Sequence, residues 1–489
     1  MKQNSRFDRL VSALLPLPFV GTAYLNILCY PLGLHAYDRL RTLLVFGFLG
    51  VVALLLLGKV LLLCRDKPES RRLILCTACL PLLYGVLQLW SLLACRDKAA
   101  IFSETLVNGC QLVSCCCALL IVLTESCLRK FLHTARIYAL ILSPIVLFYC
   151  ARFYLPKADY STHNLGSVPY MSLAYMLLEL CVFLLLEVLL YDNDRKKATA
   201  FFPVNLALTL LFSAAIALSG TKGTILCLLF CILCILAARA LLHLYMRGVQ
   251  LAVANCLVLL LFSTVLFPHN DVDNRFLSFW KELTPSTSVT ITEEDRQETS
   301  AIMDKLTPPV NREEDESPAD GSENIGNIVD SVISGEAQEK LKSGAITQEE
   351  YDKLEEIQKK LNNTSTGARK YLWSSALSEI RSAPLTGHGP HSFQEKYGTY
   401  PHNFFLELAA DFGLPITIVL FLFGLLVFLR LFRLSRFSRW YAAFLLYVLT
   451  FFPQAMISGS LYSAQVFFQY GFCVLLLFRS PAGSLCKQK

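Results

Sequence analysis

The chain has 489 residues, of which 54% are hydrophobic and only 17% are charged, and its formal net charge is +6. A soluble globular domain usually carries about 25% charged residues, and the mean hydropathy of this chain is +0.49. These values exclude a soluble enzyme, a disordered protein and a fibrous repeat. They predict an all-α polytopic membrane protein.

The charge is unevenly distributed along the chain. Residues 268–368 contain 22 acidic and 10 basic residues, so the rest of the chain is strongly basic. A basic membrane portion with an acidic soluble insert favours loops held against an anionic lipid surface. We therefore expect the lipid bilayer, and no nucleic acid, among the partners.

Apolar segments long enough to cross a bilayer recur along the chain, since a hydrocarbon core about 30 Å thick needs roughly 20 apolar residues per helix. About twelve segments qualify: 11–33, 42–63, 73–94, 107–127, 137–155, 171–190, 201–219, 224–242, 249–267, 414–432, 441–458 and 462–478. The first contains Pro16, Pro18 and Pro31, and no small-residue cleavage site follows it. We interpret it as an anchor and not as a removed signal peptide.

These segments divide the chain into three parts. Residues 1–267 hold predicted transmembrane helices 1–9, residues 268–413 form one large loop, and residues 414–489 hold helices 10–12. Clusters of Lys and Arg fall in alternate connections, near 65–72, 129–136, 195–197, 239–247 and 430–439, and at both ends of the chain. The positive-inside rule then predicts a multi-pass protein of the cell membrane with cytoplasmic termini and an extracytoplasmic, partly helical loop between helices 9 and 10.

The large loop changes character along its length. Residues 268–368 are rich in Glu, Asp, Ser and Pro, which is typical of a flexible, solvated insert, although residues 336–361 read as two short helices around Ser343-Gly344. The insert is a spacer, a lid or an acceptor guide. Residues 369–413 are instead aromatic and contain histidine.

The first predicted helix of this second part starts near Arg369 and ends before Pro384. Arg369 falls at helical spacing with Trp373, Ala376 and Ile380, so it should point toward protein. An inward arginine is costly without an anionic partner. That partner is either a bound anion or a distant carboxylate, and the alternative is an arginine that reaches back to water.

A second helix is predicted to begin at Tyr400-Pro401-His402-Asn403 and to close at Gly413. Proline suits the first helical position and glycine the position after the last. His402 would then lie in the first turn, where the helix dipole favours a neutral ring and the free N–H groups can bind an anion. A purely structural histidine is the alternative.

Three further residues lie in or beside the predicted spans. Lys222, between Gly220 and Gly223, suits either contact with a ligand phosphate or a tight turn with a lysine at the membrane surface. Glu179 and Glu187 share one apolar span, and intramembrane carboxylates are functional candidates, although helix packing explains them equally well. The 18 cysteines lie mostly in apolar runs, as buried apolar cysteines do, so we expect no metal site and no cofactor.

Together the last motifs resemble the O-antigen ligase and O-antigen polymerase (Wzy-C-like) superfamily. The resemblance covers about 50 residues and consists of Arg369-x-x-x-Trp373, then Pro384-Leu385-Thr386-Gly387-His388-Gly389, then Phe393, then His402-Asn403 nine residues before Gly413. It implies that His402 is the essential histidine and Arg369 an essential arginine that binds the donor diphosphate. Lys222 stands where the family has a second arginine, and a lysine keeps the charge without the bidentate fork. Asn403 and His388 are candidates for supporting roles.

The resemblance implies transfer of a glycan from an undecaprenyl-diphosphate carrier to a saccharide or lipid acceptor on the outer side, without a metal. A diphosphate is a good leaving group, so an inverting glycosyltransferase needs mainly cations for the developing charge and a base near the acceptor hydroxyl. Ligation and repeat-unit polymerisation both fit. The alternative is a lipid-linked oligosaccharide flippase, which would need charged residues along its spans and no His402.

Overall fold

A computed structural model describes most of the chain outside the acidic insert. The described residues are 5–34, 38–67, 71–94, 98–125, 127–155, 160–165, 168–191, 195–242, 246–267, 347–349, 351–352, 365–397, 399–435, 439–457, 459–462 and 468. Within these ranges the secondary structure is helical, with one isolated β-bridge between Leu165 and Val168. The two short helices predicted in 336–361 and most of the insert lie outside the described residues.

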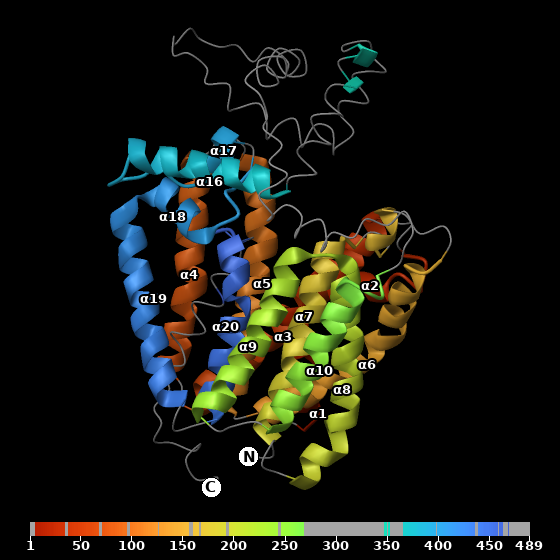
Figure 1. The fold of residues 1–489 in the computed structure, drawn as a ribbon. Helices are drawn as coiled ribbons and strands as arrows, with labels where there is room; N and C mark the ends of the chain where they lie inside the picture. Colours follow the sequence, from red (N-terminus) through yellow and green to blue (C-terminus); the bar gives the residue numbers. More distant parts are fainter. Residues whose placement is uncertain are drawn as a thin grey trace.

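Eight of the described helices are long and apolar enough to cross a membrane. They are α3 (Asp38–Asp66), α4 (Arg71–Ala94), α5 (Lys98–Thr124), α6 (Leu128–Arg152), α7 (Tyr170–Tyr191), α8 (Arg195–Ser219), α9 (Lys222–Leu242) and α19 (Leu414–Ser435). Two shorter apolar helices, α10 (Met246–Ser263) and α20 (Arg439–Ile457), stand beside them (Figure 1). The chain is therefore a multi-pass membrane protein.

The first predicted span is a bent pair of helices. α1 (Ser5–Leu14) and α2 (Leu17–Leu28) meet at an angle of 72°, and together they pass as one further span. Pro16 and Pro18 flank the start of α2, where proline removes backbone donors. Gly21 departs from helical geometry again, with φ 60° and ψ −156°. The prolines that interrupt this segment in the sequence therefore mark a real break.

The predicted spans up to residue 458 each coincide with a described helix or, for the first, with the bent pair. The twelfth, residues 462–478, lies outside the described residues except for Tyr462 and Phe468. Tyr462 is not part of a span: it lies in a turn that packs beneath the helices of the large loop. A total of twelve spans therefore stays a prediction.

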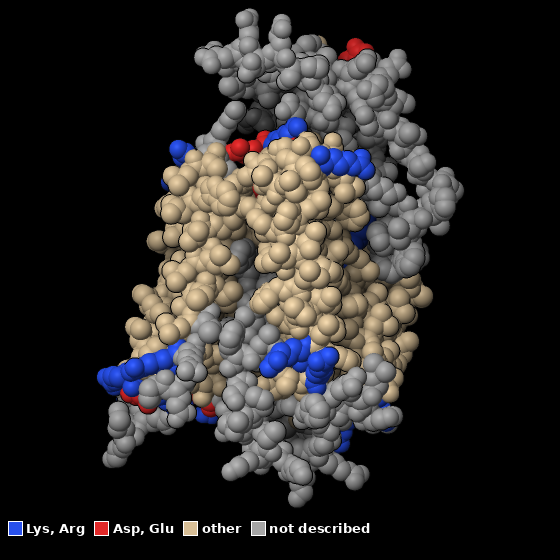
Figure 2. Space-filling model, turned by 90° about the vertical axis from the view of Figure 1, so that its left-hand side faces the viewer, with Lys and Arg blue, Asp and Glu red and all other residues tan. Residues whose placement is uncertain are grey.

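The core of the bundle is built around α7. Of its apolar window, 89% is buried, whereas only 11% of the α19 window is buried. α7 contacts α2, α6, α8 and α20, while α4 and α19 stand at one edge of the bundle (Figure 1). Because most of the apolar residues of α19 are exposed or half-buried, the helix presents an apolar face to lipid. Figure 2 shows the same edge as a broad band without charge, with Lys and Arg above and below it.

Three short helices form a layer across one end of the bundle, which we call the cap: α16 (Ser365–Ser382), α17 (Ser392–Tyr397) and α18 (Phe404–Phe412). Figure 1 shows the cap over the ends of α4, α19 and α20, at the opposite end from α1. α18 runs directly into α19, and it also contacts α20. The cap is thus joined to the membrane-spanning part through α18.

Candidate functional site

The cap has a small hydrophobic core of its own, contributed by all three helices. Its buried residues are Leu372, Ala376, Ile380, Phe393, Tyr397, Ala409 and Ala410. Leu372, Ala376 and Ile380 follow the spacing that predicted the α16 helix, and α16 ends at Ser382, before Pro384 as predicted. Burial of these side chains removes apolar area from water, which holds the three helices together.

Two glycines allow the loop after α16 to lie against the end of α18. Gly387 has φ 66°, and a Cβ there would come within 2.4 Å of the Asp411 backbone. Gly413 has φ 82°, and a Cβ there would come within 2.5 Å of the Leu385 carbonyl oxygen. The close approach is fixed by hydrogen bonds from His388 N to Ala410 O and from Leu414 N to Pro384 O. Neither position tolerates a side chain without moving the backbone.

Two buried carboxylates of α18 hold this helix in place. Their hydrogen-bond partners lie at the start of α17 and in the segment 460–462, after α20. Asp411 accepts hydrogen bonds from the backbone N–H groups of His391 and Phe393, and from the hydroxyls of Ser392 and Tyr462. Burial raises the pKa of Asp411 to about 6, although these donors oppose the shift. One turn earlier, Glu407 accepts from Ser460 Oγ and from the backbone N–H of Leu461.

The start of α18 differs from the prediction, and this changes the place of His402. The helix begins at Phe404, and Asn403 is its N-cap, with the side-chain oxygen accepting from the N–H groups of Phe405 and Leu406. His402 precedes the helix with φ 52°, a left-handed conformation that does not continue a helix. The prediction of His402 in the first turn was wrong because asparagine competes strongly as an N-cap.

The predicted anion seat at this helix start is wrong for the same reason. The amides of Phe405 and Leu406 are already bound by Asn403, so they are not available to a ligand. Asn403 also donates from Nδ2 to the carbonyl oxygen of Met456, 3.0 Å away near the end of α20. Its role in the structure is to hold the segment that carries His402 against the bundle.

His402 itself is half-buried at the junction of cap and bundle. Its ring lies 4.3 Å from the ring of Tyr400, centroid to centroid. The residue between them, Pro401, accepts a 2.9 Å hydrogen bond from the indole N–H of Trp373. His402 is therefore flanked by one contact to α16 and by the Asn403 contact to α20.

Arg369 and Lys222 can be placed by their backbones. Arg369 lies in α16, four residues and hence about one turn before Trp373, so its backbone is one turn from the contact with Pro401. Lys222 is the first residue of α9 and is half-buried. α8 ends just before it, and the alternating directions of α8 to α10 put Lys222 at the end of the bundle that carries the cap. That His402, Arg369 and Lys222 converge on one substrate stays a prediction.

His388 belongs to a separate polar cluster on α16 and α17. Its Nε2 lies 3.3 Å from Oε2 of Glu379 and 2.9 Å from the Ser382 hydroxyl. Glu379 also accepts hydrogen bonds from Lys396 and Tyr397. Burial alone would raise the pKa of Glu379, but these partners together lower it. His388 thus holds the loop that follows α16 against that helix. It belongs to a different segment of the cap from His402.

The two buried carboxylates of α18 were not predicted from the sequence. Glu407 and Asp411 are four residues apart on an otherwise apolar helix, so they share one face, and that spacing could have indicated a pair of anchors. Their partners at 391–393 and 460–462 could not be read from spacing. Among the described residues, no group of three or more His, Cys, Asp or Glu side chains is placed to hold a metal ion.

The comparison with protein families bears on this same region. A family model described as O-antigen ligase matches residues 207–421, from α8 to α19, and so includes Lys222, Arg369 and His402. No curated protein and no solved structure matches the chain significantly. The family implies a glycosyl-transferring enzyme of the membrane. Over residues 207–421, a little under half of its length, the chain is therefore similar to the O-antigen ligase superfamily.

Proposed function

We propose that this protein transfers a glycan from an undecaprenyl-diphosphate-linked donor to an acceptor hydroxyl, on the outer face of the cytoplasmic membrane. The observation that carries the proposal is the fixed position of His402. Contacts on both sides of it, from Trp373 to Pro401 and from Asn403 to Met456, hold it where cap and membrane-spanning helices meet. A lipid-linked donor reaches such a junction from the bilayer, while an acceptor reaches it from the aqueous side.

In the proposed reaction, the acceptor oxygen attacks the anomeric carbon of the donor sugar. The bond from that carbon to the diphosphate oxygen breaks, and undecaprenyl diphosphate leaves with the bonding electrons. Attack from the face opposite the leaving group inverts the anomeric configuration. His402 accepts the proton of the acceptor hydroxyl, and Arg369 and Lys222 stabilise the negative charge that develops on the diphosphate. In this proposal, the positive charge that stabilises the leaving diphosphate comes from the side chains of Arg369 and Lys222.

The test uses purified protein with an undecaprenyl-diphosphate-linked oligosaccharide and follows release of the carrier. We expect His402→Ala to lose at least about 100-fold in turnover, the usual contribution of a positioned general base. The matched control is His133→Ala, a histidine that contacts Arg136 at the other end of the bundle; it should release carrier at the wild-type rate. Release at the wild-type rate by both variants would refute the proposed role of His402.

The product of the reaction distinguishes the two forms of this function, polymerisation and ligation. A longer glycan on the carrier indicates a polymerase, and a glycan joined to a different acceptor indicates a ligase. A flippase, the alternative from the sequence, would move the donor across proteoliposomes without releasing carrier and would tolerate His402→Ala.

A further inference from the structure

A second pocket lies inside the membrane-spanning part, among helices α2, α5, α7 and α20. Its volume is about 270 Å³, and no residue of the cap lines it. Met171 and Ser172, at the start of α7, are exposed and line one end, whereas Glu179, two turns further along α7, is only 4% exposed. The pocket therefore runs into the bundle from the end that carries the cap.

The break in α2 forms one wall of this pocket. Residues 19–23 all line it, and Gly21 in their midst has a non-helical backbone. Non-helical backbone at membrane depth is tolerated where it is buried in protein or lines a polar cavity, because its peptide groups need partners. The wall is therefore suited to a polar occupant.

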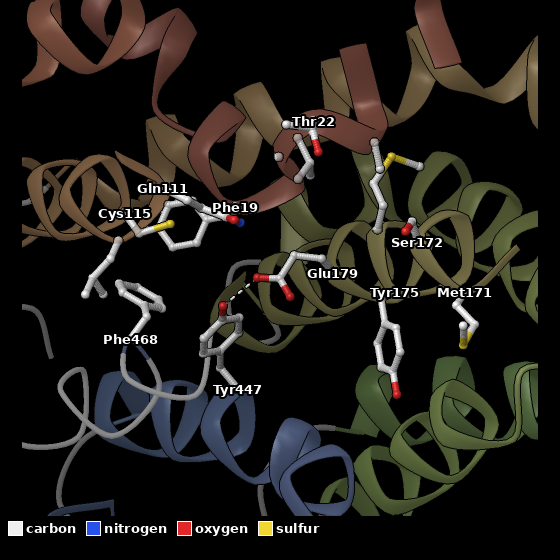
Figure 3. A pocket seen from close by; sticks show the side chains of 15 residues that line it. Phe19, Thr22, Gln111, Cys115, Met171, Ser172, Tyr175, Glu179, Tyr447 and Phe468 are labelled. Carbon is white, nitrogen blue, oxygen red and sulfur yellow. Dashed lines mark hydrogen bonds between the residues drawn. The ribbon is translucent and has the colours of Figure 1, made fainter. Parts of the chain in front are cut away.

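Two polar side chains of the pocket, Glu179 and Gln111, have unused hydrogen-bonding capacity. One oxygen of Glu179 accepts from the hydroxyl of Tyr447, and Figure 3 shows this bond across the pocket. The other oxygen makes no hydrogen bond to any residue that the structure describes, and neither does the amide of Gln111. The carboxylate of Glu179 is buried, so an unpaired oxygen there is costly, whereas Gln111 is half-buried. A ligand with hydroxyl groups would bond to both.

The composition of the walls narrows the class of ligand. No Lys, Arg or His is among the described residues that line the pocket, and that lining does not suit a phosphate or another anion. Its volume far exceeds that of one ion and is close to the roughly 300 Å³ at which small-molecule pockets begin. The rings of Phe19, Tyr175 and Tyr447 add apolar surface beside the polar groups. An uncharged sugar combines hydroxyl groups with an apolar C–H face and fits both features.

We propose that this pocket binds one uncharged sugar unit of the glycan substrate, through the carboxylate of Glu179 and the amide of Gln111. The inference rests on the proposed function, because that function brings a glycan to this end of the bundle. Glu179 and Gln111 would act in binding only, and the transfer itself would stay with His402.

The test measures binding of neutral sugars to the full chain in lipid nanodiscs by saturation-transfer NMR. The probes are lactose, maltose and the disaccharide of N-acetylglucosamine. We expect a saturation-transfer signal from at least one probe with the wild type and with His402→Ala. In each of the single variants Glu179→Gln and Gln111→Leu, this signal should be at least fivefold weaker. Gln111→Leu is informative because the amide of Gln111 has no hydrogen-bond partner among the described residues. Removing that amide should therefore leave folding intact.

The matched control is Glu187→Gln. Glu187 lies in the same helix but pairs with Arg136 and Asn205 outside the pocket, so this variant should give the wild-type signal. The absence of any sugar signal from the wild type, or equal signals from all variants, would overturn the inference. The inference would also be overturned if Na⁺ stabilised the wild-type protein against unfolding more than K⁺ does, and if this difference disappeared in Glu179→Gln. The pocket would then be a cation site. Carrier release, measured on the same samples, tests the proposed function separately.

Discussion

Asp411 shows how a single buried carboxylate can make the cap sensitive to pH. Its pKa is raised from an ordinary value of 3.8 to about 6 by burial. Between these two values the folded protein binds a proton that the unfolded chain does not, so folding is favoured below pH 4 and this contribution is lost as the pH rises through 6. Above pH 6 the charged carboxylate depends on its four donors.

We therefore expect the cap to become more stable as the pH falls from 8 to 5. Hydrogen exchange of the amides in α17 and α18 at pH 5, 6, 7 and 8, corrected for the intrinsic rate, measures this directly. In Asp411→Asn the side chain no longer titrates, so the pH dependence of protection in this part of the cap should shrink. The same variant should be less stable at every pH, since its amide nitrogen cannot accept from His391 or Tyr462. An unchanged pH profile in Asp411→Asn would show that another group is responsible.

At the scale of elements, α18 depends on one capping residue. Asn403 accepts from two amides of the first turn and donates to Met456 of α20. Loss of an N-cap side chain costs about 1–2 kcal/mol, and we expect Asn403→Ala to lower the free energy of unfolding by that amount. Asn403→Asp is the matched variant, since it keeps the capping oxygen but cannot donate to Met456.

The two variants separate capping from the contact with α20. If the contact with α20 positions His402, both variants should lower carrier release, while only Asn403→Ala should speed the hydrogen exchange of Phe405 and Leu406. Faster exchange in both variants, or in neither, would contradict the assignment of Asn403 as the N-cap.

The loop between α16 and α17 depends on close contact between two backbones. A Cβ at Gly387 would come within 2.4 Å of Asp411, whereas a Cβ at Gly389 meets nothing within 4 Å, although Gly389 also has a positive φ, 100°. We expect Gly387→Ala to destabilise the cap by more than about 3 kcal/mol, from backbone strain plus the forced separation. Gly389→Ala carries the strain alone and should cost about 1–2 kcal/mol.

Limited proteolysis measures this difference. Rapid cleavage between α16 and α18 is expected in Gly387→Ala, with the membrane-spanning part intact, and slower cleavage in Gly389→Ala. Equal resistance of the two variants would mean that the loop can move away from α18 at little cost.

At the scale of the whole molecule, the features that the sequence predicted are those set by local pattern. Apolar length alone located α3 to α10, α19 and α20, and Pro384 and Gly413 marked the ends of α16 and α18. The start of α18 was misplaced, because Pro401 and Asn403 both favour a helix start and only the folded chain shows which one acts. The contacts of Asp411 were out of reach, since Tyr462 is 51 residues away and sequence spacing holds no information on such pairs.

The orientation of the bundle is the remaining property that composition predicts. The cap lies at one end of the bundle and α1 at the other (Figure 1), so one observation of sidedness fixes the side of every described helix. The basic clusters predict that the cap and the acidic insert lie outside the cytoplasm. A protease site inserted after residue 320 should then be cut by protease added to intact spheroplasts, and the same site appended after Lys489 should be cut only after lysis. The reverse pattern would place His402 on the cytoplasmic side, and cleavage at both sites in intact spheroplasts would imply an even number of spans between them.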